Sequence, residues 1–331
     1  MHEYLQILGG VFPLFLVMAV GAAVRRVRLL NEQADRTLLD LSVHLLSPCL
    51  ILDHLMSSQA LRQWGNLCWG PMLGFFCTAG CIGIAAIAAQ LFGFKKAAQW
   101  RTFAFAAGIF NYGYIPVPLI DTLYGANALS ILFLFNLGTE TAFWTVGFAS
   151  LEGRTLFTDW RRALTTPVRA ILLGISINLA TYWLGIHLDD AALDAAAWGW
   201  PVKVLFATIH LVGLCYIPLA LLLIGATMAD FWGEFRTTHG IGVMGLSLAV
   251  RNLICPLGFV LLAWLLPISL ELKETLVVQA AMPAGVFVLL LARHHGGDVP
   301  VALQVIFSTS AAAIVTLPLW IHFGMQLVGW K

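Results

Sequence analysis

Apolar residues fill long stretches of this 331-residue chain, and short polar or charged loops separate them. The stretches are about 20 residues long, the length that crosses a hydrocarbon core of about 30 Å as an α-helix. Helices are expected because a backbone in lipid must satisfy its own hydrogen bonds. The pattern therefore predicts an all-α membrane protein with ten transmembrane helices, at residues 5–24, 36–56, 68–92, 100–124, 127–149, 166–186, 206–230, 240–266, 273–293 and 302–325.

Composition agrees with a membrane location and excludes several classes of protein. Hydrophobic residues make up 60% of the chain and charged residues 11%, whereas soluble globular proteins carry about 25% charged residues. A water-soluble enzyme is therefore excluded. The net charge of +1, without a block of basic residues, is not typical of a nucleic-acid-binding protein. Six cysteines without metal-ligand or disulfide spacing predict neither a metal nor a cofactor.

Basic residues are distributed unevenly between the two sides of the predicted bundle. Thirteen lie in the loops on one side and four in the loops on the other, with Arg251 alone inside a span. Because Lys and Arg concentrate in cytoplasmic loops, this bias predicts that both termini lie outside the cytoplasm. The loops at 150–165 and 187–205 are too short to form a core of their own, so residues 1–331 are expected to form a single transmembrane domain.

The ten predicted spans divide into two halves of five. Five spans per half means that the second half enters the bilayer from the opposite side, as in the inverted repeats of many transporters. The predicted repeats cover approximately residues 1–150 and 160–331. Two pairs of prolines at similar offsets support this division: Pro48 and Pro218, 170 residues apart, and Pro116 and Pro283, 167 residues apart.

The fourth and ninth spans are predicted to be broken in mid-membrane. Residues 111–118 contain a glycine and two prolines, and Pro283 and Gly285 lie in the ninth span. A proline removes a backbone donor and leaves carbonyls that protein or water must satisfy. If the two spans cross, two helix N-termini meet near the midplane, and each offers N–H groups and about half a unit of positive charge to an anion. The alternative is that these prolines are only packing kinks.

Several motifs, read in order along the chain, resemble the auxin efflux carrier family, which includes bacterial malonate carriers and plant auxin exporters. The resemblance covers nearly the whole sequence. In the first half it rests on Phe12–Phe15, a proline break at Leu46–Leu50, and Asn111–Gly113 followed by Pro118; in the second half it rests on Ile217–Leu221, Arg251, Pro256, Ala281–Ala284, Ser308–Thr309 and Thr316–Trp320.

This resemblance implies a ten-helix secondary carrier for organic anions, with crossed broken helices like those of bile-acid symporters and sodium/proton antiporters. It also implies the inner (plasma) membrane of a bacterium. The substrate site is expected at the crossing, formed by Asn111, Gly113, Pro116, Pro118, Met282, Pro283, Ala284 and Gly285, with Tyr112, Pro48 and Pro218 as further candidates.

The chain departs from the family pattern at three places near the expected site. Phe110 and Pro116 stand where glycine is usual, and Val286–Phe287 stand where an asparagine is frequent. The missing amide suggests a more apolar ligand or a different contact from the ninth span.

Two charged residues are predicted to lie deep in the membrane. An ionised Glu140 is costly in mid-span, so this residue is a candidate proton-coupling group; the alternative is a structural carboxylate paired with Arg251 or hydrogen-bonded to a neighbouring helix. Arg251 is a candidate clamp for a substrate carboxylate, or else it extends to the cytoplasmic interface. Weaker candidates for ion coupling are Asp53, which a solvated helix end would also explain, and Ser308 and Thr309, which helix contacts would also explain.

The sequence therefore favours secondary transport of a small organic anion, either a mono- or a dicarboxylate, by alternating access. No ATP-binding loop is present, so a gradient must supply the energy. Glu140 favours protons as the coupling ion, and sodium is the rival. The alternative class is a non-transporting sensor or an anion channel on the same fold; an enzyme is not expected, because no catalytic motif lies in a span. The expected partners are the substrate anion, the coupling ion and the lipid bilayer, and a homodimer is compatible with the Trp-rich faces.

Overall fold

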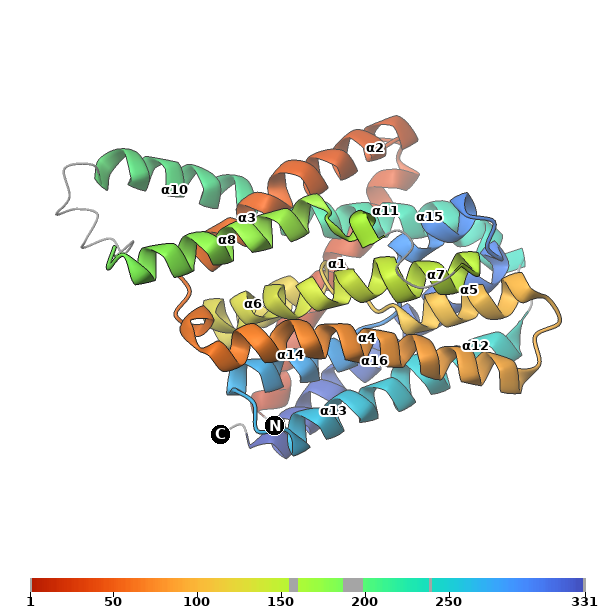
Figure 1. Ribbon diagram of the computed structural model, residues 1–331. Helices are drawn as coiled ribbons and strands as arrows, with labels where there is room; N and C mark the ends of the chain where they lie inside the picture. The colour runs from red at the N-terminus through yellow and green to blue at the C-terminus, as the bar shows by residue number, and fades with distance from the viewer. Residues whose placement is uncertain (1, 155–159, 187–198, 238–239, 330–331) are drawn as a thin grey trace.

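The computed structural model describes residues 2–154, 160–186, 199–237 and 240–329, and its regular elements there are helical (Figure 1). In the first half these are α1 (His2–Arg26), α2 (Glu32–Leu41), η1 (Ser42–Leu46), α3 (Ser47–Met56), η2 (Ala60–Arg62), α4 (Trp64–Phe92), α5 (Ala97–Gly108), α6 (Pro116–Ala142), η3 (Phe143–Gly147) and α7 (Phe148–Glu152). In the second half they are η4 (Trp160–Ala163), α8 (Thr166–Trp183), α10 (Gly199–Leu214), α11 (Tyr216–Thr237), α12 (Ile241–Ser247), η5 (Leu248–Ile254), α13 (Cys255–Leu265), α14 (Leu270–Ala281), α15 (Phe287–His294) and α16 (Val299–Val328).

These helices confirm an all-α integral membrane protein. Seven helical segments of the described chain are long and apolar enough to cross a bilayer. The predicted fourth and ninth spans each fall on two helices separated by a non-helical stretch. Within α6, Gly125 has a φ of 80°, and this kink lies between the predicted fourth and fifth spans. The count of ten spans and their inverted repeat remain predictions.

The helices pack into two groups that meet along a shared face. The first bundle contains α1, α2, α3, α8, α10 and α11, in which α1 packs on α11 and α3 packs on both α8 and α10. The second bundle contains α4 to α7 and α12 to α16, in which α4 packs on α6 and α14 packs on α6, α13 and α16. The bundles touch where α1 contacts α16 and where α3 contacts α6. The upper layer of Figure 1, formed by α10, α3, α8 and α2, belongs to the first bundle.

Paired glycines bring helices together inside each bundle. A Cβ built on Gly138 of α6 would overlap the carbonyl oxygen of Pro71, and one on Gly74 of α4 would overlap that of Phe135. Gly21 of α1 and Gly225 of α11 make the same reciprocal contact in the first bundle, against Leu222 and Met18. Small residues at such crossings let helix backbones approach closely in a membrane, where the hydrophobic effect does not drive helix association.

We expect Gly138→Val to destabilise the protein strongly, because the new side chain would push α6 away from α4. The control is Gly80→Val, at a position of α4 where an added Cβ meets nothing within 4 Å. Thermal unfolding of the detergent-purified variants, followed by size-exclusion chromatography, measures the difference. Equal melting temperatures for the two variants would contradict the close packing of α4 on α6.

The proline break expected at Leu46–Leu50 is not found. The chain runs from α2 through η1 into α3 with helical dihedrals at Leu46 and Ser47. The five residues of η1 form a wide π-type turn immediately before Ser47 and Pro48, the first two residues of α3. The wider turn therefore accommodates the proline without interrupting the helix.

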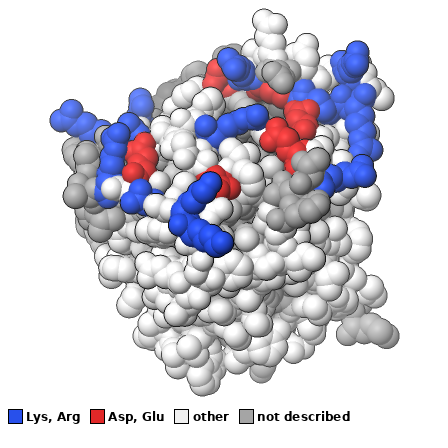
Figure 2. Space-filling view, turned by 90° about the vertical axis from the view of Figure 1, so that its right-hand side faces the viewer, with Lys and Arg blue, Asp and Glu red and all other residues white. Residues whose placement is uncertain are grey.

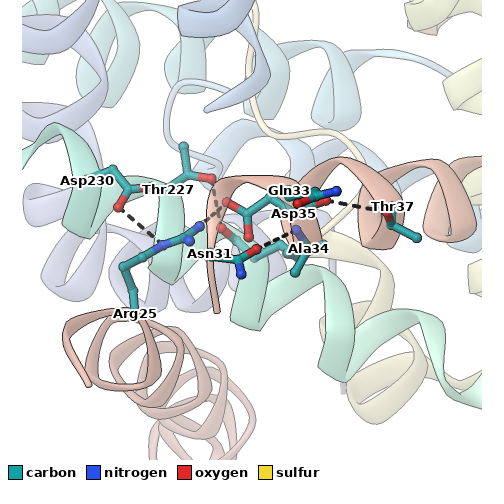
Figure 3. A network of polar contacts seen from close by, with 9 residues as sticks. Arg25, Asn31, Gln33, Ala34, Asp35, Thr37, Thr227 and Asp230 are labelled. Carbon is teal, nitrogen blue, oxygen red and sulfur yellow. Dashed lines mark hydrogen bonds and ion pairs between the residues drawn. The ribbon is translucent and has the colours of Figure 1, made fainter. Parts of the chain in front are cut away.

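Charged residues gather at the end of the molecule that faces right in Figure 1. Figure 2 looks onto this end, and Lys, Arg, Asp and Glu occupy the upper half of the view. Arg25, at the end of α1, contacts Asp35 of α2 and lies 3.1 Å from Asp230 of α11 (Figure 3). Nearby, the Asn31 side chain caps α2 by accepting from the Ala34 N–H at 2.8 Å. This network fixes three helices of the first bundle at the end that carries the basic loops.

Candidate functional site

The two interrupted helices meet in the second bundle. The first break, residues 109–115, separates α5 from α6, and the second break, residues 282–286, separates α14 from α15. The breaks pair in antiparallel fashion: the Asn111 N–H donates to the Pro283 carbonyl at 2.8 Å, and the Gly285 N–H donates to the Ile109 carbonyl at 3.0 Å. Interruptions predicted from the sequence in both spans are therefore present, and backbone hydrogen bonds join them.

Local sequence explains where the first break ends. Pro116 is the first residue of α6, where a missing N–H costs little. The Asn111 side-chain oxygen accepts from the N–H groups of Tyr114 at 3.1 Å and of Ile115 at 3.4 Å. Asn111 thus stabilises the turn of the break that leads into α6, a role for which asparagine is well suited.

A cavity of about 200 Å³ lies beside the breaks, between the two bundles. Val43, Ser47 and Tyr216 are among the residues that line it from the first bundle, and the breaks, α6 and η3 line it from the second. Glu140 is the single acidic or basic residue in the described part of its wall. The rest of the wall is largely apolar and aromatic, with Phe110, Tyr112, Tyr114, Phe133, Phe143, Trp144, Tyr216 and Phe287.

Four residues that line this cavity have a backbone N–H without a hydrogen-bond partner within the described ranges. They are Tyr112 and Gly113 of the first break, and Val286 and Phe287 at the start of α15. The first N–H groups of a helix have no partner within that helix, and they carry partial positive charge. The cavity therefore offers hydrogen-bond donors without a basic side chain.

Glu140 lies in the cavity wall, and other side chains of the wall bind it. The Tyr112 hydroxyl donates to Oε1 at 2.9 Å, and the Trp144 indole N–H donates to Oε2 at 3.0 Å. The expected alternative in which Arg251 pairs with Glu140 is wrong, because the guanidinium makes its hydrogen bonds elsewhere. Both carboxylate oxygens thus have neutral donors, which stabilise a charge at this depth.

A second set of hydrogen bonds joins the first break to α6 and α14. The Tyr112 carbonyl accepts from Asn136 Nδ2 at 2.9 Å and from Gln279 Nε2 at 3.2 Å. Gln279 Nε2 also donates to Asn136 Oδ1 at 3.1 Å. Gln279 is 0% exposed, and its Oε1 has no partner in the part of the chain that the structure describes.

Arg251 lies against the breaks but does not line the cavity. Its side chain is 0% exposed, so it does not extend to the interface. One guanidinium nitrogen donates to the Ala280 carbonyl at 3.2 Å and another to Cys81 Sγ at 3.8 Å. The guanidinium carbon lies 5.1 Å from the centre of the Phe110 ring. In this conformation Arg251 supports the break residues rather than reaching a ligand in the cavity.

The remaining substrate-site candidates fall into two sets. Asn111, Tyr112, Gly113 and Gly285 line the cavity with Glu140. The others do not line it: Pro116 and Pro118 are buried in the first turn of α6, Met282, Pro283 and Ala284 are buried in the second break, Pro48 is half-buried in α3, and Pro218 is exposed on α11.

The remaining ion-coupling candidates lie outside the cavity wall. Asp53 of α3 pairs with His210 of α10 at 2.9 Å, within the first bundle. The Ser308 hydroxyl shares a hydrogen bond with Ser247 of α12 at 2.8 Å. The Thr309 hydroxyl accepts from the Ala284 N–H at 3.2 Å, so it supports the second break from α16. The role of Asp53, Ser308 and Thr309 in ion coupling therefore stays a prediction.

Sequence reasoning did not select several residues of the cavity. Asn136 and Trp144 lie four residues before and after Glu140, so the three side chains share one helix face, and this spacing could have found them. Tyr114 and Tyr216 stack with their ring centres 5.9 Å apart and bridge the two bundles. They lie 102 positions apart in the chain, and no local pattern predicts their contact.

The fold and the cavity define a helical membrane protein with paired helix breaks beside a largely apolar cavity. The sequence matches the membrane transport protein family over residues 6–156 and 154–321. The chain therefore belongs to this family, the auxin efflux carrier family that its motifs resemble.

One relative resembles this chain along almost its whole length. It is an uncharacterized transporter of Methanothermobacter thermautotrophicus, 23% identical over 314 residues, which cover 94% of this chain and 96% of the relative. Membership of a transporter family and this relative both indicate a role in membrane transport.

Proposed function

We propose that the protein is a secondary transporter that moves a small organic anion together with a proton. The observation that carries the proposal is the composition of the cavity wall. It combines one carboxylate, Glu140, with four unpartnered backbone N–H groups, and otherwise it is mostly apolar.

The N–H groups at the two breaks are the proposed site for the substrate carboxylate. Helix N-termini attract anions because their N–H groups and dipoles point at the ligand. Asn111, which lines the same cavity, adds a side-chain amide next to them. The aromatic wall suits an apolar substrate body, so a monocarboxylate fits better than a dicarboxylate, whose second charge would need further donors.

Like-charge repulsion links the substrate to the proton. Two carboxylates about 6 Å apart repel each other by roughly 3 kcal/mol at an effective dielectric constant of about 20. An anion in this cavity therefore binds better when Glu140 is protonated. A transporter that changes sides only with both ligands bound, or with neither, is then a symporter of proton and anion.

Alternating access is proposed to arise from movement between the two bundles. The cavity has walls from both, so sliding one bundle against the other changes the side from which the cavity is reached. In this proposal the charged end in Figure 2 is cytoplasmic, both termini are outside, and the membrane is a bacterial inner membrane.

Uptake into proteoliposomes tests the proposal. The substrates are malonate, a short aliphatic monocarboxylate and indole acetate, each offered with an imposed proton gradient, an imposed sodium gradient or neither. We expect saturable uptake of a monocarboxylate, driven by an inward proton gradient. Uptake that follows the sodium gradient alone would make sodium the coupling ion. Uptake without saturation would favour an anion channel, and the absence of uptake for every substrate would favour a non-transporting sensor.

Tyr114 is expected to limit the length of the substrate. It lines both the main cavity and a smaller one of about 30 Å³, which also contacts α11. We expect Tyr114→Ala to join the two spaces and to shift the preference toward longer monocarboxylates. The control is Leu223→Ala, which enlarges the smaller cavity without opening the wall. Competition of chain-length homologues against labelled substrate measures the shift, and an unchanged preference in Tyr114→Ala would contradict this role.

A further inference from the structure

Tyr112 makes hydrogen bonds both through its hydroxyl group and through its main-chain carbonyl, and these bonds reach different parts of the site. Its hydroxyl donates to Glu140 at 2.9 Å. Its main-chain carbonyl, in the first break, accepts from Asn136 of α6 and from Gln279, two residues before the end of α14. One residue thus connects the carboxylate of the cavity with both interrupted helices.

We propose that Tyr112 is the positioning residue that transmits the protonation state of Glu140 to the two breaks. This inference rests on the proposed function and goes beyond it. Repulsion between two carboxylates explains why proton and anion bind together, but not how the backbone that receives the anion responds to the proton. Tyr112 supplies that link because its backbone N–H is one of the four unpartnered donors of the cavity.

Hydrogen-bond chemistry identifies Tyr112 as the group that responds. An ionised carboxylate only accepts hydrogen bonds, whereas a protonated one must also donate. The Trp144 indole is a donor only, so it cannot accept the new proton. Of the two side chains that hydrogen-bond Glu140, only the Tyr112 phenol can accept a hydrogen bond from the protonated carboxyl group. Protonation of Glu140 therefore reverses the bond to Tyr112 and releases the phenol hydrogen for another acceptor.

Among the described residues that line the cavity with Glu140, no other charge competes with this response. The titratable groups that face it are Tyr112 and Tyr114 from the first break and Tyr216 from α11. No Lys, Arg, His or Asp lines the described part of the cavity wall.

The hydrogen-bond network around Tyr112 also contains an acceptor without a partner among the described residues. Gln279 is fully buried, and its Oε1 lacks a partner among the described residues. A buried acceptor of this kind is costly, so a rearrangement of the break that pairs it would recover part of that cost. At Gly113, an added Cβ would meet nothing within 4 Å, so the backbone next to Tyr112 has room to move.

The test is the pH dependence of substrate binding to purified protein in lipid nanodiscs. A radiolabelled monocarboxylate that the wild type transports is the probe, and its affinity is measured at one pH below and one above neutrality. In the wild type we expect the affinity to be higher at the lower pH. A hydrogen bond to a charged group changes an equilibrium by about tenfold, so Tyr112→Phe should reduce the ratio of the two affinities by about tenfold.

Two comparison variants separate the possible outcomes. Glu140→Gln should bind with one affinity at both pH values, and Tyr182→Phe, at an exposed position of α8 outside the cavity wall, should keep the wild-type ratio. A wild-type ratio in Tyr112→Phe would overturn the inference and leave the proposed function standing. A wild type without pH dependence, or without binding, would overturn the proposed function and the inference with it.

A measurement on the wild type covers the case in which Tyr112→Phe does not fold. Infrared difference spectra between low and high pH, recorded with ring-labelled tyrosine, report whether a phenol changes from donor to acceptor. We expect a shift of the tyrosine C–O band that is absent in Glu140→Gln. A spectrum without a tyrosine shift in the wild type would contradict the reversal of the bond.

Discussion

Glu140→Gln is expected to abolish proton-driven accumulation of the substrate while leaving substrate exchange across the membrane intact. Glutamine has nearly the shape of a protonated glutamate: its amide N–H can donate to the Tyr112 oxygen while its own oxygen accepts from the Trp144 indole. The variant should therefore bind the anion at every pH, as the protonated wild type does. It cannot release a proton, so it cannot use a proton gradient.

The expected effect is large and has a clear measure. With one proton per anion, each pH unit of gradient supports about tenfold accumulation, because one unit corresponds to about 1.4 kcal/mol. In Glu140→Gln the concentration ratio across the membrane should stay near one, whereas counterflow of labelled substrate against unlabelled substrate should proceed.

Glu274→Gln is the matched control for this experiment. Glu274 is another buried carboxylate, 6% exposed, on α14, and it does not line the cavity. This variant should accumulate substrate as the wild type does. If Glu140→Gln accumulated substrate equally well under a proton gradient, Glu140 would be a structural residue, and the proton would be carried by another group.

Sequence reasoning was sufficient for features that depend on local chemistry. Apolar stretches predicted the membrane helices, because lipid tolerates little else. The prolines and glycines at 111–118 and 283–285 predicted both breaks, because a proline cannot continue a helix without loss of a hydrogen bond and a glycine in a helix costs conformational entropy. The position of Glu140 in mid-span marked it as costly, and the structure places it in the cavity wall.

Features that depend on tertiary contacts could not be predicted in the same way. The partners of Arg251 are a carbonyl, a thiol and an aromatic ring, none of which a search for opposite charges would select. The bond from Tyr112 to Glu140 spans 28 positions and requires both the break and the packing of α6. The break predicted at Pro48 was wrong for a related reason. The residue type alone predicts a break, but a wide turn in η1 accommodates the proline within a continuous helix.

Arg251→Met is expected to cause the largest loss of stability among the variants considered. The guanidinium is bonded to the Ala280 carbonyl in the last turn of α14 and lies over Phe110, two residues after the end of α5. A helix C-terminus carries about half a unit of negative charge, so Arg251 compensates the buried end of α14, and its contact with the Phe110 ring joins the first break to that end. Its removal leaves the Ala280 carbonyl without this donor, and a hydrogen bond to a charged group contributes about 1.5–3 kcal/mol.

Arg251→Lys separates the contribution of charge from that of geometry. Lysine keeps the positive charge but lacks the planar fork that reaches Ala280 and Cys81 together and stacks on Phe110. We expect this variant to fold with a lowered melting temperature and to transport more slowly, whereas Arg251→Met should give little folded protein. Arg293→Met is the control, because that arginine is exposed on α15. If Arg251→Met melted like the control and failed only in binding, Arg251 would be a substrate ligand in another conformation, the clamp that its depth in the membrane first suggested.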